Sequence, residues 1–374
     1  MHLQILDLLP GAPGVHHSLQ VLRFGTPGSG PKAYIQAALH ADEVPAILVA
    51  HALGRQLAAL EAQGLLRGEV VLVPFANPIG LGQHVLGAHE GRFDLRDGGN
   101  FNRNHADVAP EAIRLLKGSL GQDPDHNQRL VRHALRQAAG SLKAVHPAQD
   151  LKNQLLQLAV DSDVVLDLHC DHQAVMHVYA LTPQAAQAAE LGALLGAQAI
   201  LLATESGDSP FDEACSRPWQ TLQHEFADHP LPLGCFSATV ELRGEADTSH
   251  ELAEQDARAL VRFLRLRGLV DGGHGQDEPL PALLCQPTQL AGSEPLTAPC
   301  AGVVVFHRQP GDRVEAGDLI ADIVSPLTGD CQPVHCLSAG VLYACSGGRW
   351  AMPGKRLGKI AGTSLARTGK LLSP

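Results

Sequence analysis

The sequence predicts an α/β protein in which a mixed, mostly parallel sheet is flanked by helices and is followed by a C-terminal all-β region of barrel or sandwich type. Two patterns lead to this fold class. Between residues 33 and 270, short apolar runs rich in β-branched residues alternate with longer segments rich in Ala and Leu. Strands that alternate with helices in this way form a sheet covered by helices on both faces. After residue 270 the helical periodicity disappears, and short strand-like runs separated by turn residues take its place.

Each element of the α/β part is predicted from its own local pattern. Apolar runs predict strands at residues 33–39, 69–75, 163–168, 177–181, 199–203 and 236–242. Apolar spacing of three to four residues predicts helices over 46–60 and 250–267. Pro45 stands where the first helical turn tolerates proline, and Gly268 is a typical helix stop. The first and third of the strands are expected to stop at His40 and His169.

The composition divides the chain into three segments. Residues 1–270 are expected to form the α/β domain, 271–288 a linker rich in Gly, Pro and acidic residues, and 289–374 a β-rich domain. Within the last segment, an Ala-Gly-Val run followed by Pro-Gly occurs twice, starting at Ala301 and at Ala339. This repeat resembles the lipoyl/biotinyl-type barrel. A carrier domain of that type needs a displayed Lys, but the residues between the two halves include none, so no prosthetic group is expected.

Composition and charge restrict the classes of protein that the chain can represent. Its 374 residues fit two to three domains, and the formal charge of −11 without a basic stripe argues against a nucleic-acid partner. No apolar run approaches the roughly 18 residues that span a bilayer, and the first residues lack the pattern of a signal peptide. The eight Cys include no CxxC pair, which favours free thiols in a reducing compartment. A cytoplasmic protein without a membrane partner is therefore expected, and a homo-oligomer is compatible with the sequence.

Three residues near the ends of predicted strands have the side chains of a zinc site. His40 and Glu43 lie three positions apart where the first strand leads into a helix, so both can face one ion. His169 directly follows another strand and brings a third ligand to the same edge of the sheet. Catalytic Zn²⁺ commonly takes three nitrogen or oxygen ligands and keeps one position open for water. In a chain with twenty His, an HxxE pair also arises by chance, but the shared position at strand ends favours a zinc site.

Two further features supply what a catalytic site needs besides a metal. The turn-rich segment 98–104 has Arg103 between two Asn residues, and an Arg fork can hold a substrate carboxylate. The alternative is an exposed loop with an incidental Arg. Glu241 lies within an otherwise apolar strand, where a carboxylate is uncommon unless it is paired or functional. It either pairs with Arg243 or another Arg, or it acts as a general base beside a metal-activated water.

The order of these motifs resembles the zinc carboxypeptidase superfamily, and more narrowly its succinylglutamate desuccinylase/aspartoacylase branch. The resemblance covers roughly residues 33–268 and rests on HxxE, an N-R pair, DLH and a late V-E-L strand, in that order. The C-terminal β domain is also similar to that branch. The resemblance implies that His40, Glu43 and His169 are the ligands of one zinc ion per chain.

The resemblance also implies the remaining site residues. Asn102 and Arg103 would bind the carboxylate of the substrate, and Glu241 would activate water and return its proton to the leaving amine. An earlier Arg would stabilise the oxyanion. Arg92 is the match for this residue, and Arg96 is close enough in sequence to compete. The Tyr that assists some members has no clear match among the three Tyr of this chain.

These residues predict a zinc-dependent amidohydrolase, a deacylase that cleaves a small N-acyl amino acid or a related amide bearing a carboxylate. A true carboxypeptidase acting on peptide C-termini would use the same residues, and a non-catalytic metal- or ligand-binding relative would keep the same fold. The C-terminal β domain favours the deacylase, because it can narrow access to the cleft and exclude long peptides. Retention of all three ligands together with Glu241 favours an enzyme over a binding protein.

Overall fold

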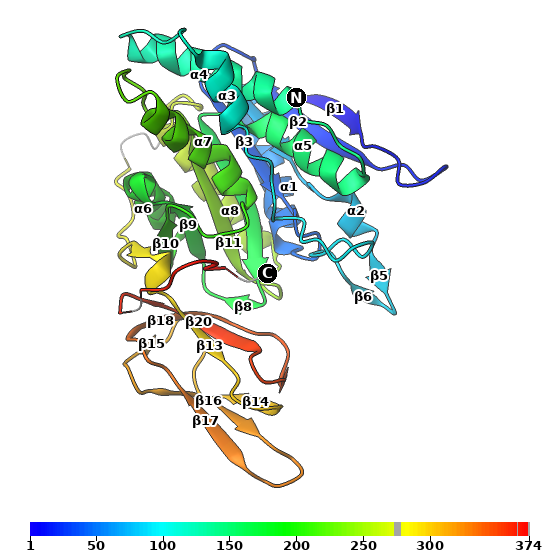
Figure 1. Cartoon of the computed structure of the whole chain (residues 1–374), viewed down its shortest axis with the longest axis vertical. Helices are drawn as coiled ribbons and strands as arrows, with labels where there is room; N and C mark the ends of the chain where they lie inside the picture. Colours follow the sequence, from blue (N-terminus) through cyan, green and yellow to red (C-terminus); the bar gives the residue numbers. More distant parts are fainter. Residues whose placement is uncertain (273–277, 365, 373–374) are drawn as a thin grey trace.

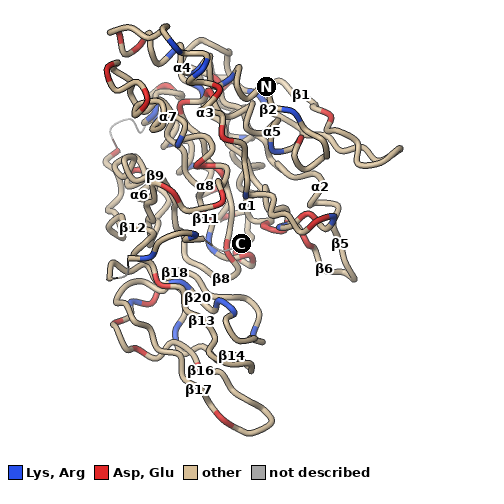
Figure 2. The backbone as a smooth tube through the Cα atoms, in the orientation of Figure 1, with Lys and Arg blue, Asp and Glu red and all other residues tan. Residues whose placement is uncertain are grey.

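The computed structural model describes residues 1–272, 278–364 and 366–372 of the chain. An α/β part and a smaller β part follow one another along the longest axis of the molecule (Figure 1). Acidic and basic residues are interspersed along the backbone of both parts (Figure 2). Residues 273–277 of the predicted linker lie outside the described residues, and the predicted domain boundaries at 271 and 288 stay a prediction.

The α/β part is built on one sheet of nine strands in the order β1-β2-β4-β3-β7-β11-β9-β10-β12. Its strands are β1 (His2–Asp7), β2 (Ser18–Gly25), β3 (Lys32–Ala37), β4 (Glu69–Val73), β7 (Val164–Asp171), β9 (His177–Leu181), β10 (Ala199–Ala203), β11 (Phe236–Gly244) and β12 (Thr288–Gln289). The central strands β4, β3, β7 and β11 are parallel, whereas β1, β2 and β9 each run antiparallel to a neighbour. The predicted mixed, mostly parallel sheet is therefore confirmed.

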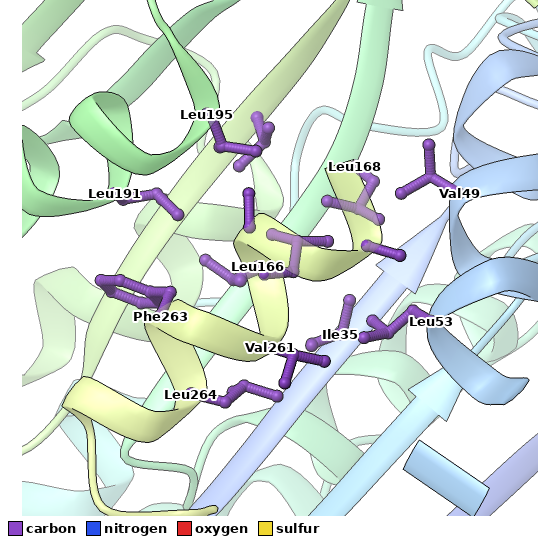
Figure 3. Close-up of a cluster of buried hydrophobic side chains, with 14 of the residues drawn as sticks. Ile35, Val49, Leu53, Leu166, Leu168, Leu191, Leu195, Val261, Phe263 and Leu264 are labelled. Atoms are coloured by element: carbon purple, nitrogen blue, oxygen red, sulfur yellow. The ribbon is translucent and has the colours of Figure 1, made fainter. Parts of the chain in front are cut away.

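Helices cover both faces of this sheet and enclose two hydrophobic cores. One face carries α1 (Pro45–Ala62), α6 (Ala185–Leu195) and α8 (His250–Leu266), and the other carries α3 (Ala109–Leu116), α4 (Pro124–Gly140), α5 (Pro147–Ala159) and α7 (Phe211–Glu225). In the first core, part of which is drawn in Figure 3, Val49 and Leu53 of α1 and Val261 of α8 are buried in one cluster with Ile35 and Leu166 of the sheet. Burial of such side chains stabilises the fold by about 25 cal/mol per Å² of apolar surface.

Among the strand ends that differ from the predicted ones, two lie near the metal-ligand candidates. β3 ends at Ala37 instead of residue 39, because Ala38 takes a left-handed backbone conformation (φ 57°) that breaks the strand. β7 continues to Asp171 instead of stopping at His169, because its pairing with β11 extends through both residues. His169 therefore lies within a strand, and the prediction that it follows the strand end was wrong.

The C-terminal part consists of two antiparallel sheets over a common apolar core. One sheet has the order β13-β20-β18-β15 and the other the order β17-β16-β14-β19. Their strands are β13 (Glu294–Thr297), β14 (Gly302–Phe306), β15 (Arg313–Val314), β16 (Leu319–Val324), β17 (Cys331–His335), β18 (Gly340–Cys345), β19 (Trp350–Ala351) and β20 (Arg356–Gly362). Ile320, Leu342 and Ile360 from the two sheets are buried together in this core. The predicted C-terminal all-β region is confirmed.

The two parts meet at the carboxyl end of β7. The short connecting elements of the α/β part are α2 (Pro78–Leu81), β5 (His84–Val85), β6 (Ala88–His89), β8 (Gln173–Ala174), η1 (Thr182–Gln184) and η2 (Leu290–Gly292). Of these, β8 pairs with β18 of the C-terminal part. The Val175 N–H donates to the Tyr343 carbonyl oxygen at 3.0 Å, and Arg349 Nη2 donates to Gln173 Oε1 at 2.8 Å. The sheet of β18 and β20 is thereby joined to the segment that follows the His169 strand.

Candidate metal centre and cleft

The loop between β3 and α1 carries His40 and Glu43 into the interior of the protein. The two residues are only 3% and 5% exposed. Pro45 is the first residue of α1, so the loop is short and is fixed by a strand at one end and a helix at the other. The Ala41 N–H donates to the Gly91 carbonyl oxygen at 3.1 Å, and a Cβ at Gly91 would collide with the backbone of the loop. Glycine at position 91 therefore lets the neighbouring chain pack closely against it.

His40, Glu43 and His169 form one cluster of metal-ligating side chains. Glu43 lies between the two imidazoles, with Oε1 2.8 Å from His40 Nδ1 and Oε2 2.6 Å from His169 Nδ1. The rings meet edge to face, with their centroids 4.9 Å apart. One ligand atom from each of the three residues lies within 4.8 Å of the others. The structure therefore brings the three predicted ligands together, and their arrangement can hold a metal ion.

Nε2 of each imidazole, the ring nitrogen that faces away from Glu43, has a partner of its own. His40 Nε2 lies 2.9 Å from Asn100 Oδ1, and His169 Nε2 lies 2.9 Å from Asp167 Oδ2. An oxygen acceptor at Nε2 can hold a proton there, which frees the lone pair of Nδ1 for a metal ion. The only signal in the sequence for Asn100 was its place in the Asn-rich loop.

The charges within the cluster suit a metal ion. Burial, and then Arg92, lower the pKa of His40 to about 4, so its imidazole is neutral near pH 7. Burial alone would raise the pKa of Glu43, but His169 and His40 hold it well below its usual range. Burial alone would lower the pKa of His169, but Asp167 and Glu43 hold it well above its usual range. A proton on His169 thus supplies positive charge between two carboxylates, and a divalent cation can take its place.

Glu241 lies on β11 next to this cluster. It is paired in the sheet with His169 of β7, and its Oε2 is buried without a hydrogen-bond partner among the described residues. Burial, and then Glu43, raise the pKa of Glu241 to about 8. Arg243, which was considered as an ion-pair partner for Glu241, pairs instead with Asp256 of α8. Glu241 is therefore a half-buried carboxyl group close to the ligands.

A cleft of about 230 Å³ lies between the α/β part and the C-terminal part. Its α/β wall includes Arg92, Asp171 and Glu241, and its opposite wall is formed by residues 344–346 and 355–359. Figure 2 shows basic residues beside β18 and β20, where the two parts meet. The C-terminal part therefore supplies one side of the cleft into which Glu241 faces.

Lys359 of β20 reaches from the C-terminal part to the α/β part. Its ammonium forms an ion pair with Asp171, two residues after His169, and lies 5.9 Å from the ring centroid of Tyr343. Burial disfavours the charge, but Asp171, Tyr343 and Glu241 together raise the pKa of Lys359. No sequence pattern indicated this residue, because the contact joins positions 188 residues apart and depends on how the two parts pack.

Arg92 and Arg96, the two candidates for the oxyanion stabiliser, lie in different surroundings. Arg92 Nη1 is 3.2 Å from His40 Nδ1 and 3.3 Å from Glu43 Oε1, and its side chain also lines the cleft. Arg96 forms ion pairs with two nearby aspartates, and its Nη2 lies 3.0 Å from His146 Nδ1. The structure therefore brings Arg92 to the cluster and holds Arg96 elsewhere.

Asn102 and Arg103, the predicted carboxylate binders, lie in a buried loop behind the cluster. Asn102 Oδ1 accepts the Phe211 N–H at the start of α7 at 2.8 Å, and its Nδ2 lies 3.3 Å from His169 Nε2. Arg103 Nη1 donates to the Asn102 carbonyl oxygen at 2.7 Å. Burial, and then the charge of Arg92, lower the pKa of Arg103. Neither residue lines the cleft of about 230 Å³, so their role in substrate binding stays a prediction.

Comparisons with known proteins point to one family. Residues 29–267 match the family model of the succinylglutamate desuccinylase/aspartoacylase catalytic domain. A succinylglutamate desuccinylase/aspartoacylase family protein from Shewanella amazonensis is 25% identical, with 96% of this chain and 98% of that chain covered and a TM-score of 0.83. The ectoine utilization protein EutE (DoeB) from Ruegeria pomeroyi has the same fold at 17% identity, with 96% and 95% covered and a TM-score of 0.62. No curated protein sequence matches the chain.

The sheet, its helices and the His-Glu-His cluster define a hydrolase with the zinc carboxypeptidase type of fold. More narrowly, the chain belongs to the succinylglutamate desuccinylase/aspartoacylase family. This membership supports a deacylase that acts on small amides bearing a carboxylate. Among the helices of the described residues, none combines the length and the apolar character needed to cross a membrane.

Proposed function

We propose that this chain is a zinc-dependent deacylase that hydrolyses the amide bond of a small N-acyl amino acid or a related amide bearing a carboxylate. The observation that carries the proposal is the juxtaposition of a three-ligand cluster with an acidic and a basic side chain at one cleft. Glu241 and Arg92 both line the cleft, and both lie next to the His40, Glu43 and His169 cluster. Family membership independently supports a deacylase.

The cluster fits one zinc ion per chain. Two imidazoles and one glutamate are a donor set of hydrolytic zinc sites, which keep a further position for water. The neutral imidazole of His40 and the ionised carboxylate of Glu43 are the forms that bind a metal. When bound, zinc would polarise the amide carbonyl and lower the pKa of a water molecule.

The side chains around the cluster would carry the proton transfers and the charge stabilisation. Glu241 would take a proton from the attacking water and pass it to the departing nitrogen, and a pKa of about 8 suits a group that both accepts and releases a proton. Arg92 would stabilise the negative charge that develops on the carbonyl oxygen. Asn102 and Arg103 would hold the carboxylate of the substrate, and Arg103 lies close enough to Arg92 for their charges to interact.

The C-terminal part supports a small substrate over a peptide. The cleft volume of about 230 Å³ is below the usual range of roughly 300–1,000 Å³ for ligand pockets. Residues 344–346 and 355–359 form its outer wall, and the partly buried Lys359–Asp171 ion pair fixes that wall to β7. A long peptide would have to displace this wall to bring its last amide bond to Glu241.

A substrate panel is expected to separate the deacylase from a carboxypeptidase. The purified, zinc-loaded protein should hydrolyse at least one N-acyl amino acid with a kcat/KM far above that for any peptide in a series of increasing length. The reason is the outer wall that the C-terminal part adds to the cleft, which leaves room for a short acyl group more easily than for a peptide chain. Higher kcat/KM for peptides with free C-termini would instead make the chain a carboxypeptidase.

Arg92→Ala is expected to lower kcat by roughly 10²–10³-fold, the usual effect of removing one oxyanion donor. Arg96→Ala is the matched control, because Arg96 lies four positions away and is held by aspartates outside the cleft. Its kcat should stay close to that of the wild type. Kinetics on protein of equal zinc content would measure both effects. A large loss for Arg96→Ala beside a small one for Arg92→Ala would reverse the two assignments.

A further inference from the structure

A chain of buried polar side chains continues from His169 along the side opposite Glu43. Tyr34 O–H donates to Gln36 Oε1 at 2.7 Å, and Gln36 Nε2 donates to Asp167 Oδ1 at 2.9 Å. Asp167 Oδ2 in turn lies 2.9 Å from His169 Nε2. Tyr34, Gln36 and Asp167 are 0% exposed, so water does not reach them. The proposed reaction uses none of these three side chains directly.

The strand register explains how this chain forms. In the parallel pair of β3 and β7, Gln36 lies opposite Asp167. Alternate residues of a strand face the same side of a sheet, so Tyr34 and Gln36 share one face on β3, and Asp167 and His169 share that face on β7. β3 also leads into the loop that carries His40. The chain therefore connects the two strands from which both imidazoles are held.

The geometry places Asp167 against the nitrogen of His169 that faces away from Glu43. Asp167 Oδ1 accepts from Gln36 Nε2, whereas Oδ2 has no hydrogen bond of good geometry among the described residues and lies 2.9 Å from His169 Nε2 as its ion-pair partner. A buried carboxylate oxygen is costly without such a partner. Gln36 Oε1 is taken by the Tyr34 hydroxyl, which turns the amide nitrogen of Gln36 toward Asp167. When a metal ion replaces the proton between His169 and Glu43, a proton held at Nε2 by Asp167 would leave the Nδ1 lone pair of His169 free for that ion.

Asn102 is the other side chain near the same nitrogen. Its Nδ2 lies 3.3 Å from His169 Nε2, farther than the 2.9 Å to Asp167 Oδ2. An amide nitrogen is a donor and cannot accept a proton from His169. Asn102 can donate to Nε2 only when Nε2 carries no proton, whereas Asp167 is the side chain of the two that can accept a proton from Nε2. The contact with Asp167 therefore favours the tautomer in which Nδ1 is free to bind a metal.

We propose that Asp167 is a positioning residue that sets the zinc affinity of the site by fixing the tautomer and the orientation of His169. Gln36 and Tyr34 hold Asp167 in turn and act only through it. This inference rests on the proposed function, because it takes His169 as a zinc ligand. It concerns metal affinity, so its test needs no substrate and no turnover.

The test is the affinity of the metal-free protein for zinc alone, measured by competition with a chromophoric chelator at constant pH. Asp167→Ala is expected to weaken zinc binding by about 10–100-fold, as removal of such a supporting group usually does. Asp167→Asn should lose less, because its amide oxygen still accepts the Nε2 proton. Asp256→Asn is the matched control, because Asp256 is a carboxylate 1% exposed that pairs with Arg243. Its zinc affinity should equal that of the wild type.

A double variant tests whether the side chains act in series. Gln36→Leu alone should weaken zinc binding less than Asp167→Ala, because Asp167 remains beside His169. The double variant of Gln36→Leu and Asp167→Ala should bind zinc no more weakly than Asp167→Ala alone. Fully additive losses of zinc affinity would show that Gln36 acts on the metal by another route. That result would contradict the claim that Gln36 acts only through Asp167.

The thermal unfolding midpoint of each metal-free variant shows whether it is folded. Equal zinc affinity of folded Asp167→Ala and wild type would overturn the positioning role and leave the zinc site intact. Failure of the wild type to bind zinc would instead overturn the proposed function. If Asp167→Ala does not fold, the isosteric Asp167→Asn is measured in its place. Zinc affinities equal to that of the wild type in both Asp167→Asn and Gln36→Leu would then overturn the proposal.

Discussion

Glu241→Gln is expected to lower kcat by roughly 10²–10⁴-fold, the range over which general acid–base catalysis contributes, and to leave the zinc content unchanged. Gln keeps the shape of the side chain but cannot take a proton from water. Glu241 lines the cleft beside His169, and it is not one of the three clustered ligands. Steady-state kinetics of the zinc-loaded variant on the best N-acyl amino acid measures the loss.

Glu69→Gln is the matched control for this variant. Glu69 is also a glutamate on a strand of the same sheet, 7% exposed, but it pairs with Arg23 and does not line the cleft. The kcat of Glu69→Gln should be that of the wild type.

The pH dependence of the wild type should also report the base. Because the base works in its ionised form, wild-type kcat/KM should rise with pH through an acid limb at or below about pH 8, and Glu241→Gln should lack that limb. Undiminished turnover by Glu241→Gln would remove Glu241 as the base.

Removal of the metal is expected to reduce activity by about three orders of magnitude. A zinc ion contributes several kcal/mol of transition-state stabilisation, and each 1.36 kcal/mol is about tenfold in rate. Dialysis against a chelator removes the ion without a mutation, and His169→Ala removes one of the three ligands. Activity assays before and after chelation, followed by the same assay after zinc is returned, measure the effect.

Recovery with zinc is the control for this experiment. The chelated wild type should regain its activity when about one equivalent of zinc per chain is added. His169→Ala should regain little, because the remaining imidazole and carboxylate hold the ion weakly. Full activity of a protein freed of metal would contradict a metal-dependent hydrolase.

Much of the fold follows from local patterns in the sequence. The helices predicted at 46–60 and 250–267 are observed as α1 and α8, because Pro45 and Gly268 mark helix ends chemically. Apolar runs likewise indicated six of the nine strands of the large sheet, but β1, β2 and β12 were not predicted. The order β4-β3-β7-β11 could not be predicted, since strand pairing joins segments far apart in the sequence and no local pattern specifies it.

The site was predictable where its residues have unusual surroundings in the sequence. The spacing of His40 and Glu43 and the isolated carboxylate of Glu241 are visible without a structure. The Gln36–Asp167 contact is not, because it joins positions 131 residues apart through the strand register. A Gln within the apolar run of β3 was the one signal available for it. Lys359 had no such signal, because its contact depends on the packing of the two parts.

The zinc content of the purified, folded protein tests the metal centre at His40, Glu43 and His169 most directly. Elemental analysis of the wild type should give about one zinc per chain, and the same analysis of folded His169→Ala should give far less. Glu69→Gln should keep the wild-type content, because Glu69 pairs with Arg23 and not with the cluster. A native wild-type protein that neither contains zinc nor binds it when it is added would contradict the metal centre.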